Sequence, residues 1–252
     1  MVLDIEGTIA PLAFVSEQLF PYARSHVQHH VESNFASDEC QRDVDALRQF
    51  VAAELASGNA DRSRGLVAIP AASAGKAAVV SAVVASVHAL IDQDRKAGPL
   101  KQLQGHIWRG GFESGKLVGE LFDDLIPALN SWAANGIKTY IYSSGSREAQ
   151  RMLLAHSRFG DLRAHFSGFF DTAVGAKVEA SSYSEIYLTL GLDDPAEIMF
   201  ATDNVREAEA AVAAGWRCCL VDRPGNNPLP PSGGLPAGVP VIKSMGELLS
   251  RH

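Results

Sequence analysis

Two acidic residues stand two positions apart near the start of the chain, in the stretch Asp-Ile-Glu-Gly-Thr at residues 4–8. If a strand ends at Leu3, the carboxylates of Asp4 and Glu6 can point the same way, and Gly7 lets the chain turn sharply above them. Ligands of open α/β sheets bind beyond the carboxyl ends of the strands. The same five residues also describe an ordinary surface turn, so the rest of the chain must decide.

Three later segments carry polar residues at places where they could meet this pair of acids. Ser143 and Ser144 follow a predicted strand, where hydroxyls, N–H groups and a helix N-terminus could bind an anion, although a simple helix cap explains the same residues. Lys177 lies in a Gly-containing loop before a helix, but most lysines are solvated. Asp203 ends an apolar strand, where an acid is often only a helix cap.

Considered together, these residues indicate phosphoryl chemistry. Asp4 and Asp203 can hold a hard cation such as Mg²⁺ by oxygen, while the serine turn and Lys177 surround a phosphoryl group. The cation is needed because an attacking carboxylate would otherwise be repelled by the charge of that group. Lysine and N–H donors then stabilise the charge on the group that is transferred.

The elements that must position these residues follow from the hydrophobic periodicity. Apolar residues at three- and four-residue spacing predict helices over 14–31, 38–55, 76–96 and 100–108, with a loop at 59–75 and a stop at Gly98-Pro99. From residue 122 the pattern alternates. Helices are predicted at 123–134, 146–156, 181–190 and 206–214, strands at 137–142, 166–170, 198–202 and 218–221, and a last strand–helix pair from residue 239.

Repeated βα units of this kind imply a doubly wound parallel sheet. The first strand belongs to that sheet, but roughly a hundred mostly helical residues separate it from the others, too many for a loop. We therefore predict an α/β fold in which residues 1–13 and 122–252 form the catalytic core. Residues 14–121 are predicted to form an inserted, mostly helical cap domain.

Composition narrows the class of protein. A formal net charge of -7 argues against a sequence-independent nucleic-acid binder and against an anionic-membrane binder. The longest apolar run, residues 77–91, is shorter than the roughly 20 residues that a membrane span needs. The acid at position 4 precedes any apolar signal sequence, and three cysteines make no disulfide framework. We expect a soluble, cytoplasmic monomer.

The order of the four polar segments resembles the haloacid dehalogenase superfamily of aspartate-nucleophile phosphatases. Residues 4–8 resemble its first motif, Ser143 or Ser144 the second, Lys177 the third and Asp203 the fourth. The resemblance implies a haloacid dehalogenase-like core. The superfamily usually has Asp-x-Asp in the first motif, whereas this chain has Glu6 as the second acid.

With Glu6 at this position, the sequence as a whole resembles the enolase-phosphatase (acireductone synthase) family of methionine salvage. Generic phosphatases of the superfamily would not share the segment around Gln104 and Trp108. The similar stretches are residues 20–22, 94–96, 100–108, 140–146, 148–150, 156–157, 160–162, 170–179 and 223–226.

The resemblance implies a mechanism. Asp4 attacks phosphorus and forms an aspartyl-phosphate, while Glu6 serves as general acid and then general base. Ser143, Ser144 and Lys177 bind the phosphate, and Lys177 also takes part in catalysis. One Mg²⁺ per subunit is bound by Asp4, the backbone carbonyl of Glu6 and Asp203.

The substrate implied by the resemblance is 2,3-diketo-5-methylthiopentyl-1-phosphate, a small phosphorylated diketone that is enolised and then dephosphorylated to the acireductone. Glu207, one turn after Asp203, is expected to orient a water at the cation. Two other functions stay open: another small-molecule phosphatase of the same superfamily, and a non-catalytic Mg²⁺-binding regulatory protein. A dehalogenase fits less well, because it needs no divalent cation and has no use for Asp203.

Overall fold

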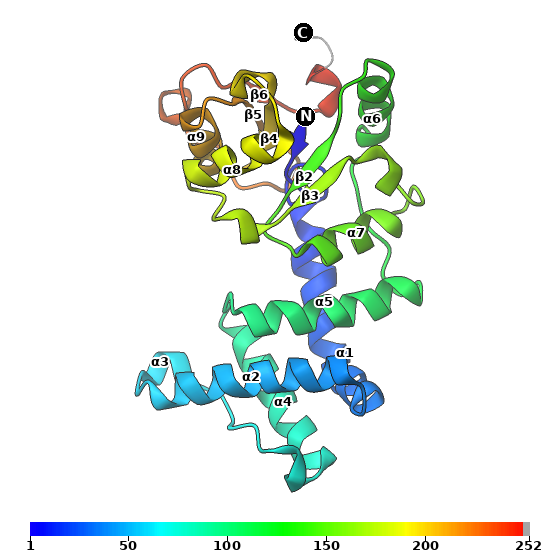
Figure 1. Cartoon of the computed structure of the whole chain (residues 1–252), viewed down its shortest axis with the longest axis vertical. Coiled ribbons are helices and arrows are strands. Elements are labelled where there is room, and N and C mark those ends of the chain that lie inside the picture. Colours follow the sequence, from blue (N-terminus) through cyan, green and yellow to red (C-terminus); the bar gives the residue numbers. More distant parts are fainter. Residues whose placement is uncertain (249–252) are drawn as a thin grey trace. The chain divides into compact units, whose positions relative to one another are not determined.

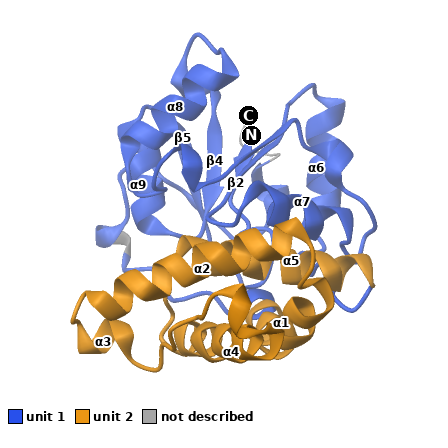
Figure 2. Ribbon diagram, turned by 60° about the horizontal axis from the view of Figure 1, so that its bottom comes forward, with its two compact units in different colours: residues 1–15, 115–252 blue, residues 16–114 orange. Residues whose placement is uncertain are grey.

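The computed structural model describes residues 1–248, which divide into two compact units (Figure 2). Unit 2 comprises residues 16–114, and unit 1 comprises residues 1–15 with the described part of 115–252. The sequence placed the domain boundaries at 13/14 and 121/122. Residues 115–121 group with unit 1 because Gly119 donates a backbone hydrogen bond to His156 (2.8 Å) and accepts one from Arg158 (2.9 Å).

Unit 1 is built on a parallel sheet of six strands in the order β3-β2-β1-β4-β5-β6 (Figure 1). This arrangement confirms the predicted α/β class with a doubly wound parallel sheet. The strands are β1 (Val2–Leu3), β2 (Tyr140–Tyr142), β3 (Gly168–Phe170), β4 (Met199–Thr202), β5 (Arg217–Val221) and β6 (Val241–Ile242).

The short strand β1 lies between two neighbours. Leu3 is in register with Ile141 of β2 and with Ala201 of β4, and all three side chains are fully buried. Because both edges of β1 are paired, its two residues suffice to fix where the following loop begins. The chain enters the acidic stretch directly from the middle of the sheet.

Four helices of unit 1 flank this sheet. Figures 1 and 2 show α8 (Ala180–Leu190) and α9 (Val205–Ala213) to one side, and α6 (Leu125–Ala134) and α7 (Arg147–Ala155) to the other. The predicted strand at 137–142 is shorter than expected. Its first residues instead close the end of α6, where the N–H of Ile137 bonds to the carbonyl of Trp132 (2.9 Å). After β6, a 3₁₀ helix forms over Met245–Leu248.

Unit 2 is helical and has its own core. A π-helical segment (Phe14–Leu19) begins in the last residues of the first part of unit 1 and leads into α1 (Phe20–Asn34). The other helices of unit 2 are α2 (Asp38–Ala56), α3 (Ala60–Ser63), α4 (Lys76–Asp92) and α5 (Gly98–Glu113). Buried side chains of α1, α2, α4 and α5 form one hydrophobic cluster. Among the described residues, no helix combines the length and apolar character that a membrane span requires.

Three expectations for unit 2 were wrong in detail. Helix α4 ends at Asp92 rather than at residue 96, and Asp94 then takes a positive φ of 50° that does not continue a helix. Gly98-Pro99 begins α5 instead of only stopping the previous helix, because proline fits the first helical turn. The predicted loop at 59–75 contains α3, whose N-terminus is capped by Asn59.

Candidate active site

The parallel register brings three of the predicted site segments to one edge of the sheet. Asp4 follows β1, Ser143 follows β2, and Asp203 follows β4, and β1 is hydrogen-bonded to both of the other strands. The N–H of Asp4 also donates to the carbonyl of Ala201 (2.9 Å), which extends the pairing by one residue. These carboxyl strand ends are where an open α/β sheet binds its ligands.

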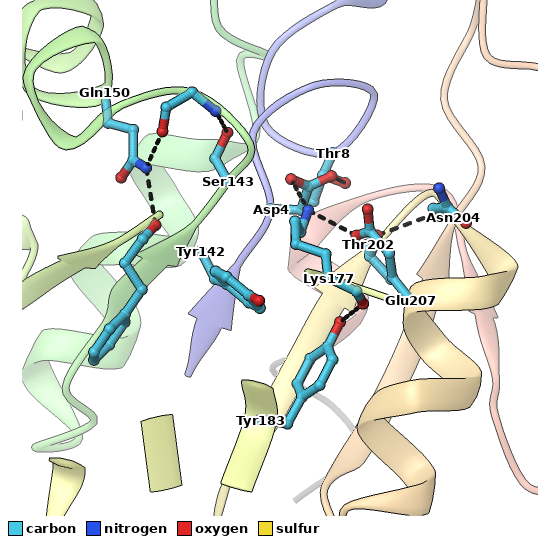
Figure 3. Close-up of polar contacts among 12 residues, drawn as sticks. Asp4, Thr8, Tyr142, Ser143, Gln150, Lys177, Tyr183, Thr202, Asn204 and Glu207 are labelled. Atoms are coloured by element: carbon cyan, nitrogen blue, oxygen red, sulfur yellow. Dashed lines mark hydrogen bonds and ion pairs between the residues drawn. The ribbon is translucent and has the colours of Figure 1, made fainter. Parts of the chain in front are cut away.

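Lys177 joins this group from the loop after β3. Its Nζ lies 2.5 Å from Oδ1 of Asp4 and 2.7 Å from Oε2 of Glu207 (Figure 3). The hydroxyls of Thr8 and Thr202 donate to the same two carboxylates, at 3.5 Å to Asp4 and 2.8 Å to Glu207. The lysine side chain is 5% exposed, so this ammonium group is committed to the two acids rather than to solvent.

The loop that carries Lys177 is held by two tyrosines. The hydroxyl of Tyr183 in α8 donates to the carbonyl of Lys177 (2.7 Å), and the hydroxyl of Tyr142 in β2 donates to the carbonyl of Gly175 (3.2 Å). Gly175 has φ +129°, and a Cβ there would lie 2.2 Å from Oγ of Ser182. The close approach therefore requires glycine, and it fixes the backbone two residues before the lysine.

The electrostatics of the site are dominated by carboxylates. Burial disfavours the charge on Lys177, but Asp4 and Glu207 outweigh it and raise the pKa of the ammonium group. Burial and the charges of Asp4 and Glu207 raise the pKa of Asp203 to about 7. Burial and Asp4 likewise raise the pKa of Glu207 to about 7, against the opposing effect of Lys177. One ammonium group thus faces three carboxyl groups.

The serines of the turn after β2 have different roles. Ser146 is the N-cap of α7 and accepts a hydrogen bond from the N–H of Ala149 (3.2 Å), so capping does not account for Ser143 and Ser144. Ser143 is buried, and its oxygen accepts from the N–H of Gly145 (3.2 Å). Ser144 is exposed. The arrangement can present hydroxyl groups beside the N-terminus of a helix, where anions are favoured.

Gly7 brings the acidic loop against Asp203. It has φ +70°, and a Cβ at this position would lie 2.3 Å from Oδ2 of Asp203 and 3.1 Å from Oδ1 of Asn226. No larger residue fits there without moving the aspartate. Glu6, directly before this glycine, is half-buried, and its backbone bridges to Ala10 as the loop turns.

The donor set suits a hard divalent cation. The described residues contain no group of three His, Cys, Asp or Glu side chains arranged as metal ligands. Mg²⁺ does not require one, because it keeps several waters and uses one or two carboxylates. The excess negative charge around Asp4 and Asp203 fits a cation, as does the buried Oδ1 of Asn226, which has no hydrogen-bond partner among the described residues.

Sequence reasoning missed several residues that shape this site. Thr202 and the tyrosines at positions 142 and 183 were not singled out, and Glu207 was assigned only a role at a water. Thr202 could have been found, because it ends β4 directly before Asp203, at the edge of the sheet where the other site residues lie. Tyr183 gives no such signal, since its contact with Lys177 depends on how the loop folds.

Solved structures resemble the whole chain. The UTR4 protein from Saccharomyces cerevisiae superposes with a TM-score of 0.71 at 28% identity, over 96% of this chain and 96% of that one. The YfnB protein from Bacillus subtilis, described as a putative HAD-hydrolase bound to magnesium, has a TM-score of 0.55 at 14% identity, over 99% of this chain and 96% of its own. At that identity the second likeness shows the fold alone.

Curated relatives are closer in sequence. A protein of Oryza sativa subsp. indica is 50% identical over 98% of this chain, and its name is probable bifunctional methylthioribulose-1-phosphate dehydratase/enolase-phosphatase E1. Proteins of the same name from Physcomitrium patens and Arabidopsis thaliana are 52% and 51% identical over 93% of this chain. The chain spans 46% of the length of each of these three relatives.

The family itself is established by a model that covers most of the chain. The model for haloacid dehalogenase-like hydrolases matches residues 1–215, which include all four polar segments of the site. This match confirms the resemblance that those segments suggested. The chain belongs to the haloacid dehalogenase-like hydrolases.

Proposed function

We propose that this chain is a Mg²⁺-dependent enolase-phosphatase that converts 2,3-diketo-5-methylthiopentyl-1-phosphate to the acireductone and phosphate. The observation that carries the phosphatase half is the buried contact of Lys177 with Asp4, at 2.5 Å. A carboxylate held by an ammonium group at the carboxyl edge of the sheet suits a nucleophile whose target carries negative charge. The names of the curated relatives include enolase-phosphatase, which supports the enolase half. The diketone substrate follows from the family resemblance.

In the proposed mechanism, Asp4 attacks phosphorus, and the leaving oxygen departs as the aspartyl-phosphate forms. Glu6 protonates that oxygen and then takes a proton from the water that hydrolyses the aspartyl-phosphate. Lys177 neutralises charge on the phosphoryl oxygens, and Glu207 keeps the ammonium group oriented from its other side. Ser143 and Ser144 donate hydrogen bonds to the phosphate.

The residues that would hold the cation are Asp4, Asp203 and the main-chain carbonyl of Glu6. When bound, Mg²⁺ supplies positive charge that lets a carboxylate approach a phosphate and that polarises a carbonyl oxygen for enolisation. Burial, followed by repulsion from Asp4 and Glu207, raises the pKa of Asp203, and a bound cation would offset both effects, which supports this assignment.

The relatives carry two activities in their names, and this chain spans 46% of their length. We propose only the enolase-phosphatase activity for it. Enolisation requires that a proton leave carbon while negative charge develops on the adjacent carbonyl oxygen. Glu6 is our candidate for moving this proton, because it is the remaining acid of the loop that carries the nucleophile.

An anaerobic assay with the diketone phosphate tests the proposal in two readouts. The acireductone chromophore reports enolisation, and released phosphate reports hydrolysis. We expect both from the native chain with Mg²⁺, and neither after chelation. Phosphate without the chromophore would instead identify a general phosphatase of the same family.

Replacing the nucleophile separates chemistry from folding. Asp4→Asn keeps the size of the side chain but removes its ability to form an aspartyl-phosphate, so phosphate release should fall below detection. Thermal unfolding should remain cooperative in that variant. Turnover equal to that of the native chain would exclude Asp4 as the nucleophile.

A further inference from the structure

The turn after β5 reaches back to the acidic loop with two side chains. Arg223, Pro224, Gly225 and Asn226 form a tight turn in which the N–H of Asn226 donates to the carbonyl of Arg223 (3.1 Å). Gly225 has φ +88°, as the third residue of a type II turn requires, and proline is common at the position before it. The turn lets its first and last residues both reach the acidic loop.

Both side chains bind main-chain oxygens of the acidic loop. Nε of Arg223 donates to the carbonyl of Thr8 (3.1 Å), and Nδ2 of Asn226 donates to the carbonyl of Gly7 (2.8 Å). The loop satisfies its own N–H groups: Gly7 donates to the carbonyl of Ala10, and Thr8 to that of Ile5. The turn therefore supplies donors to two main-chain carbonyls of the loop.

Arg223 is itself fixed from three directions. Its guanidinium group makes a bidentate pair with Asp124 (2.8 and 3.0 Å) and donates to the carbonyl of Lys243 (3.0 Å). It also lies 4.3 Å from the ring centre of Phe122. The side chain is only 5% exposed, so it acts as a rigid link rather than as a surface arm.

Asn226 is only half satisfied. Its amide nitrogen donates to Gly7 and Val221, but its buried Oδ1 has no partner among the described residues. Oδ1 of Asn226 and Oδ2 of Asp203 both lie within 3.1 Å of one point, the place that a Cβ on Gly7 would occupy. A residue needed only for folding would be expected to satisfy both ends of its amide, because a buried unpaired acceptor costs stability.

We infer that Arg223 and Asn226 are positioning residues that clamp the loop bearing Asp4 and Glu6. Fixing the carbonyls of residues 7 and 8 sets the backbone immediately after Glu6, and through it the carboxylates that the reaction uses. Hydrogen bonds to the main chain beside reacting groups hold those groups in place before the substrate arrives. The catalytic consequence rests on the proposed function, whereas the clamp itself does not.

Two variants loosen the clamp and one matched variant does not. Asn226→Ala removes the donor to the carbonyl of Gly7. Arg223→Lys keeps a positive charge beside Asp124 but lacks the planar guanidinium group, which donates to several oxygens at once. Arg158→Lys is the control. Arg158 also donates through Nε to a main-chain carbonyl, that of Leu121 (2.9 Å), and it also pairs with an aspartate and lies beside a phenylalanine ring.

Amide hydrogen exchange of residues 5–10 tests the clamp without any turnover. We expect the amides of this segment to exchange about tenfold faster or more in Asn226→Ala and Arg223→Lys, and at the native rate in Arg158→Lys. Unchanged exchange in Asn226→Ala would overturn the clamp. If Arg223→Lys fails to fold, Asn226→Ala decides alone.

Steady-state kinetics test the positioning role, at a temperature where each variant is folded. We expect kcat to fall about 10- to 100-fold with KM within about twofold, because the groups assigned to the phosphate are untouched. Native kcat together with faster exchange would overturn the positioning role. If the native chain releases no phosphate, the proposed function fails, and the exchange result still decides whether the clamp exists.

Discussion

Nζ of Lys177 lies 2.5 Å from Oδ1 of Asp4, although 173 positions separate the two residues in the chain. The same nitrogen lies 2.7 Å from Oε2 of Glu207, so one ammonium group links the loop after β1, the loop after β3 and helix α9. Each contact is buried, and removal of the lysine would leave two carboxylates facing each other without compensation. Lys177 therefore supports both the stability of this edge of the sheet and its proposed chemistry.

Lys177→Met should remove the positively charged ammonium group while keeping most of the side-chain length. We expect the free energy of unfolding to fall by about 3–5 kcal/mol, because one partner of a buried ion pair is lost. Phosphate release should fall about 100- to 1,000-fold at saturating Mg²⁺. Lys116→Met, at an exposed position of unit 1, is the control for both measurements. Equal activity in the two variants would exclude a catalytic role for Lys177.

Gly7→Ala should disturb the site through Asp203. The positive φ of 70° costs alanine about 1–2 kcal/mol, and the added Cβ would meet the carboxylate at 2.3 Å. Gly136→Ala has nearly the same φ, 72°, with nothing within 4 Å of the added carbon, so it carries only the conformational cost. Mg²⁺ affinity and kcat should fall in Gly7→Ala alone. Equal losses in the two variants would show that backbone strain is the whole effect.

The sequence predicted the sheet because its signals are local and repeated. Alternating βα units fix a parallel sheet, and a parallel sheet places all carboxyl strand ends at one edge, so Asp4, Ser143 and Asp203 could be grouped without a structure. Their assigned roles remain predictions. Lys177 was grouped with them on its charge and its place in a Gly-containing loop before a helix. Its contact with Asp4 could not be predicted, because a loop has no register that spacing would reveal.

What the sequence could not predict depends on contacts between distant segments. Nothing local indicates that Tyr183 bonds to the carbonyl of Lys177, or that Arg223 bonds to the carbonyl of Thr8. The errors in element bounds arose where one short sequence is compatible with two local structures. Gly98-Pro99 can stop a helix or begin one, and only the packing of α5 decides between these outcomes.

Glu207→Gln should separate the support of Lys177 from the reaction itself. The amide oxygen can still accept hydrogen bonds but carries no negative charge, so the attraction that holds Lys177 from this side is weakened. We expect kcat to fall about 10- to 100-fold, as for other groups that orient a reacting residue. Glu209→Gln, on an exposed position of the same helix, should leave kcat unchanged. A native kcat in Glu207→Gln would exclude this orienting role.

A second polar network lies within unit 2 and is centred on a buried histidine. Nδ1 of His106 in α5 lies 2.5 Å from Oδ2 of Asp43 in α2, and Gln102 donates to the other oxygen of that carboxylate (2.7 Å). Nε2 of His106 lies 3.6 Å from Glu39. The histidine thus stands between two acids and bridges two helices.

The charge of His106 should make the stability of unit 2 depend on pH. The hydrogen bond to Asp43 raises the pKa of His106 despite burial, with help from Glu39 and against Arg109. His30 lies nearby, and burial lowers its pKa. Because the folded pKa of His106 exceeds the unfolded value of about 6.5, its stabilising contribution is complete below that pH. It is lost as the pH rises through the folded pKa.

His106→Gln isolates this contribution. At pH 6 we expect unit 2 of the variant to be less stable by about 1.5–3 kcal/mol, the range for hydrogen bonds to charged groups, and the difference should shrink toward pH 9. Hydrogen exchange of peptides from α2 and α5 reports unit 2 by itself. His29→Gln is the control, since that side chain is exposed on α1. A difference that grows from pH 6 to pH 9 would reverse the sign and exclude a protonated His106 as the stabilising form.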